Sequence, residues 1–115
     1  MRRGDICLVN FEPTLGSEAA RTRPAVVVSN DGANTTAWLL GRGVITVVPV
    51  TSNVREIYPF QTLLPAHDTG LDIDSKAQAE QVRSVAVDRV GPVVGTVPFL
   101  LMVLLDDALR IHLSL

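Results

Sequence analysis

Lysine, cysteine and aromatic side chains are scarce in this chain. Of its 115 residues only Lys76 is a lysine and only Cys7 is a cysteine, and aromatic residues make up 4%. A single cysteine excludes a disulfide framework and a cysteine-rich metal site, and it fits a reducing compartment. We expect Cys7 to be a small buried hydrophobic residue, in a core built from Val, Leu, Ile and Ala.

The chain also lacks an excess of positive charge. Its formal net charge is −2 and its pI is about 5.5, which excludes binding of nucleic acid through bulk charge, because that mode needs a clearly basic domain. Any such site must be local. The basic residues that could form one lie in the first half of the chain: Arg2, Arg3, Arg21, Arg23, Arg42 and Arg55.

No segment is apolar enough for a signal peptide or a membrane anchor. The most apolar run, 98–105, stops at Asp106 and Asp107 and is far shorter than the roughly 20 residues that span a bilayer. We therefore expect a cytoplasmic protein with no membrane contact. A chain of 12.4 kDa has room for one core, so residues 1–115 are expected to form a single domain.

Short segments rich in Val, Ile and Leu, each bounded by Gly, Pro, Asn or Asp, predict strands. They are 5–11, 25–29, 43–50 and 59–64. The polar segments between them, 12–22 and 31–41, are expected to be long loops, with Asn30-Asp31-Gly32 marking a turn. Long loops on a rigid sheet commonly carry function.

Two later segments differ in how clearly their sequences predict a secondary structure. Residues 75–85 favour a helix by propensity, yet their alternation also fits a strand. Near the C-terminus, Thr96 can cap a helix and Pro98 suits its first turn. The apolar residues that follow recur at helical spacing, at Leu101, Leu104, Leu105, Ala108, Leu109 and His112. These features predict a β-barrel or rolled sheet with a terminal amphipathic helix across it.

Familiar catalytic motifs are absent. There is no Gly-x-Ser-x-Gly, no phosphate-cradling glycine loop and no His-Glu-x-x-His. His67 and His112 have no partner at a recognisable spacing, so we interpret both as structural or exposed. The acidic stretch 67–74 lacks the spacing of a calcium loop and is interpreted as a solvated turn.

One phrase remains as a candidate site. Residues 16–24 form a polar loop with Ser17 and Glu18 that ends at Arg23, and the chain then enters a predicted strand. Pro24 restricts Arg23 to an extended backbone. An arginine held at the mouth of a strand is suited to binding a phosphate, although most such arginines are ordinary surface residues.

With that phrase, several blocks make the sequence resemble the MazF/PemK (Kid) toxin family over nearly its whole length. In order, they are Arg3-Gly4-Asp5-Ile6, Gly16-Ser17-Glu18, Arg23-Pro24-Ala25-Val26-Val27, Val48-Pro49-Val50-Thr51-Ser52, Tyr58-Pro59-Phe60 and Glu80-Gln81-Val82-Arg83-Ser84. The resemblance implies an SH3-like, CcdB-type small barrel of antiparallel strands with a C-terminal α-helix. It also implies a core strand at residues 75–84, against helix propensity.

In function, the resemblance implies a homodimeric, metal-independent endoribonuclease that cuts single-stranded RNA in a sequence-specific manner. It would be the toxin of a type II toxin–antitoxin pair that inhibits translation and growth. An antitoxin similar to MazE, with a flexible acidic tail that occupies the RNA groove, is the expected partner. No metal and no other cofactor are expected.

The resemblance also assigns roles to single residues. The family's essential arginine falls on Arg23, its essential threonine on Thr51 and its loop glutamate on Glu18, while Ser17 and Gln81 fall on positions that contact RNA. Cleavage by the neighbouring 2′-hydroxyl would leave 2′,3′-cyclic phosphate and 5′-hydroxyl ends. Arg23 suits the developing negative charge, Thr51 a non-bridging oxygen, and Glu18 is the candidate base.

Base selection is expected from loops that bind unpaired nucleotides, at residues 12–22 and 54–57. Cys7 departs from the family pattern, since relatives often carry a large aromatic there. Two other readings stay open. One is a toxin of the same fold that binds DNA gyrase, like CcdB, which would not need the pair of Arg23 and Thr51; the other is an inactive barrel that binds peptides.

Overall fold

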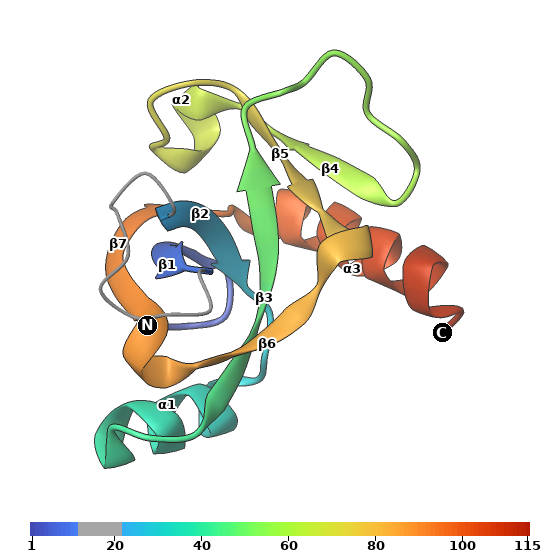
Figure 1. The fold of residues 1–115 in the computed structure, drawn as a ribbon. Helices are drawn as coiled ribbons and strands as arrows, with labels where there is room; N and C mark the ends of the chain where they lie inside the picture. The colour runs from blue at the N-terminus through green and yellow to red at the C-terminus, as the bar shows by residue number, and fades with distance from the viewer. Residues whose placement is uncertain (12–21) are drawn as a thin grey trace.

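A computed structural model describes residues 1–11 and 22–115, and Figure 1 shows how they are arranged. Within these ranges the chain forms one antiparallel sheet of seven strands. The strands are β1 (Asp5–Asn10), β2 (Thr22–Val27), β3 (Val44–Thr51), β4 (Gln61–Leu64), β5 (Ser75–Gln78), β6 (Arg83–Ala86) and β7 (Val90–Thr96). Ser17 and Glu18 lie outside the described residues.

The sheet curves strongly around the centre of the molecule (Figure 1). Its hydrogen-bonded order is β4-β5-β3-β2-β1-β7, and β6 pairs with β3 beyond the part that pairs with β5. Among the described strands no pairing joins β4 to β7, so the barrel is open there. The predicted fold class, mainly antiparallel β with a C-terminal helix, is confirmed.

The helices are α1 (Asp31–Leu40), the short α2 (Ala66–Thr69) and α3 (Phe99–Leu113), with 3-10 turns η2 (Ala79–Gln81) and η3 (Val87–Arg89). Helix α1 lies near the start of β3, and α3 lies alongside β4 and β5 (Figure 1). Helix α3 packs against β4 and η2, and α1 packs against β3. No helix among the described residues is long and apolar enough to cross a membrane.

The central strands β1, β2 and β3 bury residues on both faces, because each face has its own apolar cluster. One cluster lies under α3 and contains Ile6, Val26, Val48, Val50, Leu64, Met102 and Leu105. The other lies on the side of α1 and contains Cys7, Val9, Ala25, Val27, Ala37, Ile45 and Val47. This explains why the strand segments read as nearly continuous apolar runs. The expected burial of Cys7 is confirmed, and that burial raises the pKa of its thiol.

The four strands predicted from the apolar runs are confirmed to within a few residues as β1 to β4. The loop predicted for residues 31–41 is wrong, because α1 occupies it. The Asn30 side chain accepts a hydrogen bond of 2.8 Å from the Ala33 backbone N–H, and Gly41 ends the helix in the left-handed conformation. Asn-Asp-Gly suits a turn, but the same short polar side chains also cap helices.

The single strand predicted for residues 75–84 is interrupted. Strand β5 ends at Gln78, η2 turns the chain, and β6 starts at Arg83. The turn allows β5 and β6 to pair with different parts of β3: Val50 faces Ala77, whereas Val47 faces Arg83. Strands β5 and β6 therefore pair with successive parts of β3, where the sequence indicated a single strand.

Strand β7 was not predicted, and its sequence shows why. Gly91, Pro92 and Gly95 are poor strand residues, but β7 lies at an edge, where proline is tolerated. The C-terminal helix is confirmed, although it begins at Phe99 and not at a Thr96 cap, because Thr96 ends β7. Its buried face contains Met102, Leu105 and Ala108, whereas Leu104 is exposed.

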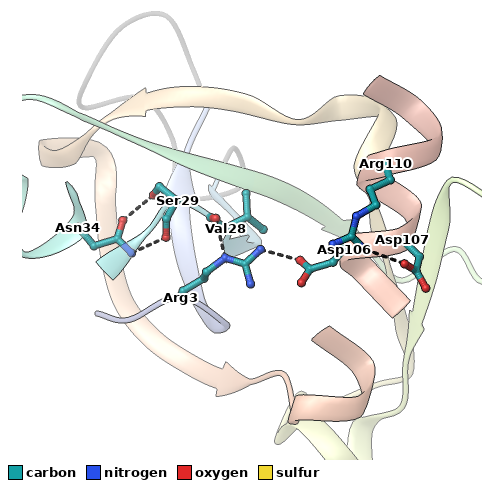
Figure 2. Close-up of polar contacts among 7 residues, drawn as sticks. All are labelled: Arg3, Val28, Ser29, Asn34, Asp106, Asp107 and Arg110. Carbon is teal, nitrogen blue, oxygen red and sulfur yellow. Dashed lines mark hydrogen bonds and ion pairs between the residues drawn. The ribbon is translucent and has the colours of Figure 1, made fainter. Parts of the chain in front are cut away.

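Arg3 connects α3 to the end of β2 (Figure 2), and its backbone also contacts α1. Its Nε donates to the carbonyl of Val28 at 2.9 Å, and its Nη2 lies 2.6 Å from Asp106 Oδ1. Its backbone N–H donates to the Asp31 carboxylate at 2.6 Å. Beside it, the buried Asn34 amide donates to the Ser29 carbonyl at 2.9 Å. These contacts fix the start of α1 and the middle of α3 on the same framework.

Candidate active site

Arg23 and Thr51 lie at neighbouring ends of two paired strands. In the antiparallel pairing of β2 with β3, Ala25 faces Pro49. Arg23 and Thr51 each lie two positions beyond this pair, and the same register continued to them would set them opposite each other on one face of the sheet. An exposed arginine and a half-buried threonine therefore lie near the point where the β2–β3 pairing ends.

Both residues line a hollow of about 700 Å³, here called the β2–β3 hollow. Its remaining lining residues are Leu8, Pro24, Val50, Ser52, Gly70, Leu71, Asp72, Ile73, Ser75 and Val94. Pro24 fixes the backbone next to Arg23 and forms part of the wall. The volume falls within the range of small-molecule sites in proteins, so the hollow has room for more than a phosphate.

The Thr51 hydroxyl is oriented by the loop that follows β3. It accepts a hydrogen bond of 3.2 Å from the backbone N–H of Asn53, and the Asn53 side chain in turn accepts one of 3.3 Å from the N–H of Arg55. Because a hydroxyl has one proton to donate as well as lone pairs, this arrangement leaves Thr51 able to donate toward the hollow.

The loop after β3 is itself held in place by a hydrogen bond from Lys76. This lysine is 7% exposed, and its Nζ donates to the carbonyl of Glu56 at 2.7 Å. In the sheet Lys76 faces Thr51 directly. The loop that contains the predicted specificity segment 54–57 is therefore attached to the strand position opposite the threonine.

Gln81 lies on the other side of β3 from Arg23. It is an exposed residue at the end of η2, two positions before Arg83, which faces Val47 in β3. The preceding residue, Glu80, is held by Gln61, whose Nε2 donates to Glu80 Oε2 at 2.7 Å. Gln81 does not line the hollow.

The stretch 67–74, interpreted from sequence as a solvated turn, is only partly so. His67 and Asp68 are exposed, as expected for His67, and so is His112. However, residues 70–73 form one wall of the β2–β3 hollow. The sequence contained no signal for this role, because only the folded arrangement of the strands brings these residues into the same hollow as Arg23.

The charges around Arg23 are sparse within the described part of the chain. There, no carboxylate lies within ion-pair distance of Arg23, and Asp72 is the one acidic residue in the lining of the hollow. Arg83 lies 5.1 Å from the centroid of the Phe11 ring. The described residues contain no group of three His, Cys, Asp or Glu side chains that could hold a metal ion.

The comparison with known families and solved structures bears on the fold and on the family of the chain. The family described as "PemK-like, MazF-like toxin of type II toxin-antitoxin system" matches residues 2–113. The chain belongs to this family. The endoribonuclease MazF9 of Mycobacterium tuberculosis is 59% identical over 115 residues, which are 100% of this chain and 98% of MazF9.

Solved structures of the family agree. MazF from Deinococcus radiodurans superposes with a TM-score of 0.75 at 28% identity, covering 100% of this chain and 97% of that protein. A MazE–MazF structure from the same organism gives a TM-score of 0.75 at 26% identity, with the same coverage. Membership of a family of endoribonuclease toxins, predicted from the sequence blocks, is confirmed.

Proposed function

We propose that this protein is the endoribonuclease toxin of a type II toxin–antitoxin pair and that it cuts single-stranded RNA at the β2–β3 hollow. The observation that carries the proposal is the placement of Arg23 and Thr51, from two different strands, in the wall of one hollow. Family membership supplies the reaction class, and the similarity to MazF9 at 59% identity extends over all of this chain.

In the proposed reaction, the 2′-hydroxyl next to the scissile phosphate gives its proton to a base and attacks phosphorus, and the 5′-oxygen leaves and takes up a proton from solvent. The products are a 2′,3′-cyclic phosphate and a 5′-hydroxyl end. Arg23 binds the phosphate and stabilises the negative charge of the phosphorane, as a guanidinium does by two parallel hydrogen bonds. Thr51 donates to a non-bridging oxygen.

Proton transfer would involve the segment before β2. Glu18 is the proposed base that accepts the proton of the attacking 2′-hydroxyl, since a carboxylate in hydrogen-bond reach of a hydroxyl can accept its proton. Ser17 and Gln81 are proposed to bind RNA on either side of the scissile phosphate. In this scheme the charge of the phosphorane is met by protein groups, so no metal is required.

The partners follow from the family. The MazF of D. radiodurans has been solved together with MazE, and we propose that this chain binds an antitoxin of that kind. An acidic, flexible segment would be attracted to the hollow by Arg23. We further propose a homodimer in the cytoplasm. Several large apolar residues of α3 are exposed in the single chain, among them Phe99, Leu100 and Leu104, and a dimer contact would cover such residues.

The test is cleavage of a long, varied RNA by purified protein in EDTA, with sequencing of the cut ends. Arg23→Ala should lower the rate by about 100-fold or more, and Thr51→Val, which keeps the shape and removes the hydroxyl, should also lower it. Arg42→Ala, at an exposed arginine outside the hollow, should cut like wild type. The absence of cutting by folded, antitoxin-free wild type would refute the proposal and direct attention to gyrase binding.

A further inference from the structure

The β2–β3 hollow has two chemically different sides. On one side are Arg23, Thr51 and Ser52, which suit a phosphate. On the other side are Leu71, Asp72 and Ile73, from the segment between α2 and β5. A carboxylate repels phosphate, so Asp72 has no use in binding the RNA backbone. A ligand group that carries hydrogen-bond donors would suit this carboxylate.

We propose that Asp72 and its apolar neighbours form a nucleobase subsite next to the scissile phosphate, which accepts a base with an exocyclic amino group and disfavours uracil. Adenine, cytosine and guanine each present an amino group that can donate to a carboxylate, which only accepts. Uracil presents carbonyl oxygens at the corresponding positions, and these would face the negative charge. This inference rests on the proposed function.

The apolar part of the wall suits the faces of a base. Leu71 is half-buried against the core, whereas Ile73 is 61% exposed although it is a large apolar residue. Leu8, Pro24 and Val94 complete the apolar lining. Protein sites for unpaired RNA bases combine such contacts to the base face with hydrogen bonds to the Watson–Crick edge.

The segment that carries Asp72 is held at both ends, so the carboxylate is presented from a fixed position. Before it, Thr69 Oγ1 donates to the Pro65 carbonyl at 2.9 Å and accepts from the Leu71 N–H at 3.3 Å. After it, Asp74 Oδ1 accepts from the Ala66 N–H at 2.8 Å. A binding group of this kind selects between ligands best when its geometry is set before the ligand arrives.

Strand β7 fixes the same segment from behind. A Cβ built on Gly95 would lie 2.6 Å from the carbonyl oxygen of Thr69, so only glycine permits this close approach. Gly70 has a φ of +84°, which also favours glycine. The backbone of β7 therefore positions this wall. The wall does not depend on the loop after β3, which is one of the two segments where the sequence predicted base selection.

The test compares Asp72→Asn with Asp68→Asn, an exposed carboxylate of the same segment that does not line the hollow. Binding is measured with 2′-O-methyl pentamers of A, C and U, which lack the attacking hydroxyl. The quantity of interest is the affinity for the A or C pentamer divided by that for the U pentamer. We expect Asp72→Asn to lower this ratio by roughly tenfold and Asp68→Asn to leave it unchanged.

A ratio that is the same in Asp72→Asn and wild type would overturn the subsite. Because the pentamers cannot be cleaved, this outcome is separate from failure of the proposed reaction, which is read from the Arg23→Ala comparison on cleavable RNA. In sequenced cut ends, wild type should exclude uracil at one position beside the cut, and Asp72→Asn should admit it there. A wild-type cut site with uracil at every neighbouring position would also refute the proposal.

Discussion

Arg3 and Asp106 form an ion pair of 2.6 Å across 103 positions of sequence (Figure 2). The pair joins the residue before the first strand to the middle of the last helix. Arg3 also donates to the Val28 carbonyl, so its guanidinium bridges α3 and the end of β2. A second pair on the same helix, Arg110 with Asp107, is confined to neighbouring turns.

These two pairs give a matched comparison. Arg3→Ala removes the ion pair and leaves the Val28 carbonyl without this donor, so we expect the free energy of unfolding to fall by about 1–2 kcal/mol. Arg110→Ala removes only a local pair and should cost about 0.2–0.5 kcal/mol. Urea unfolding of both variants at equal protein concentration measures the difference. Equal costs would show that the long-range pair does not stabilise the docking of α3.

Gly95→Ala should damage the site more than the fold. The added methyl group would lie 2.6 Å from the Thr69 carbonyl, so the segment that forms one wall of the hollow must move. We expect a loss of about 1–3 kcal/mol in the free energy of unfolding, with a larger relative loss of RNA cleavage at temperatures where the variant is folded. Gly32→Ala is the control, because its nearest contact is the Asn30 side chain at 3.2 Å.

Stability at acid pH should depend on Asp31. The hydrogen bond from the Arg3 backbone N–H, followed by smaller effects of Asn34 and nearby arginines, holds the pKa of Asp31 below its usual value of 3.8. Because the folded-state pKa is lowered, the stabilisation is complete above the unfolded pKa and is lost as pH falls through the folded pKa. The difference in unfolding free energy between wild type and Asp31→Asn should therefore shrink as the pH falls below the usual pKa of the carboxyl and through its lowered folded-state pKa. A constant difference over that range would contradict this assignment.

Lys76→Met should loosen the loop after β3 without opening the sheet. The substitution keeps the apolar stem but removes the donor to the Glu56 carbonyl and the charge 5.8 Å from the Tyr58 ring centroid. We expect trypsin to cleave faster after Arg55 and at an unchanged rate after Arg42, which lies before the opposite end of β3. Unchanged cleavage after Arg55 would show that Lys76 does not hold this loop.

The fold could be predicted from the sequence where the pattern of apolar residues favours one secondary structure. The short apolar runs that form β1 to β4 and the helical spacing of leucines in α3 are such patterns. Asn30-Asp31-Gly32 suits a turn and a helix start equally, and only the packing of Ala37 against the sheet decides for the helix. The sequence of β7 contains glycine and proline, and it becomes a strand because β1 offers it an edge to pair with.

The candidate site could likewise be predicted from the sequence only in part. Arg23 and Thr51 could be selected by family resemblance, and the register of β2 and β3 then explains how they come together. Asp72 could not be selected, because 49 residues of chain separate it from Arg23 and nothing in the acidic stretch distinguishes it from Asp68. Which acid faces the hollow is decided by the contacts of Thr69, Gly95 and Asp74, and these are visible only in three dimensions.

Because Lys76 is the only lysine of the chain and is buried, the rate at which it is modified can report how often the structure opens locally. Lys76 is 7% exposed and its ammonium donates to the Glu56 carbonyl, so an amine-specific reagent should react with it mainly when the loop after β3 detaches. Acetylation of Lys76, followed by mass spectrometry over time, would report how often that detachment occurs in the native state. Bound RNA or antitoxin that covers the loop should slow the acetylation of Lys76, which offers a measure of occupancy.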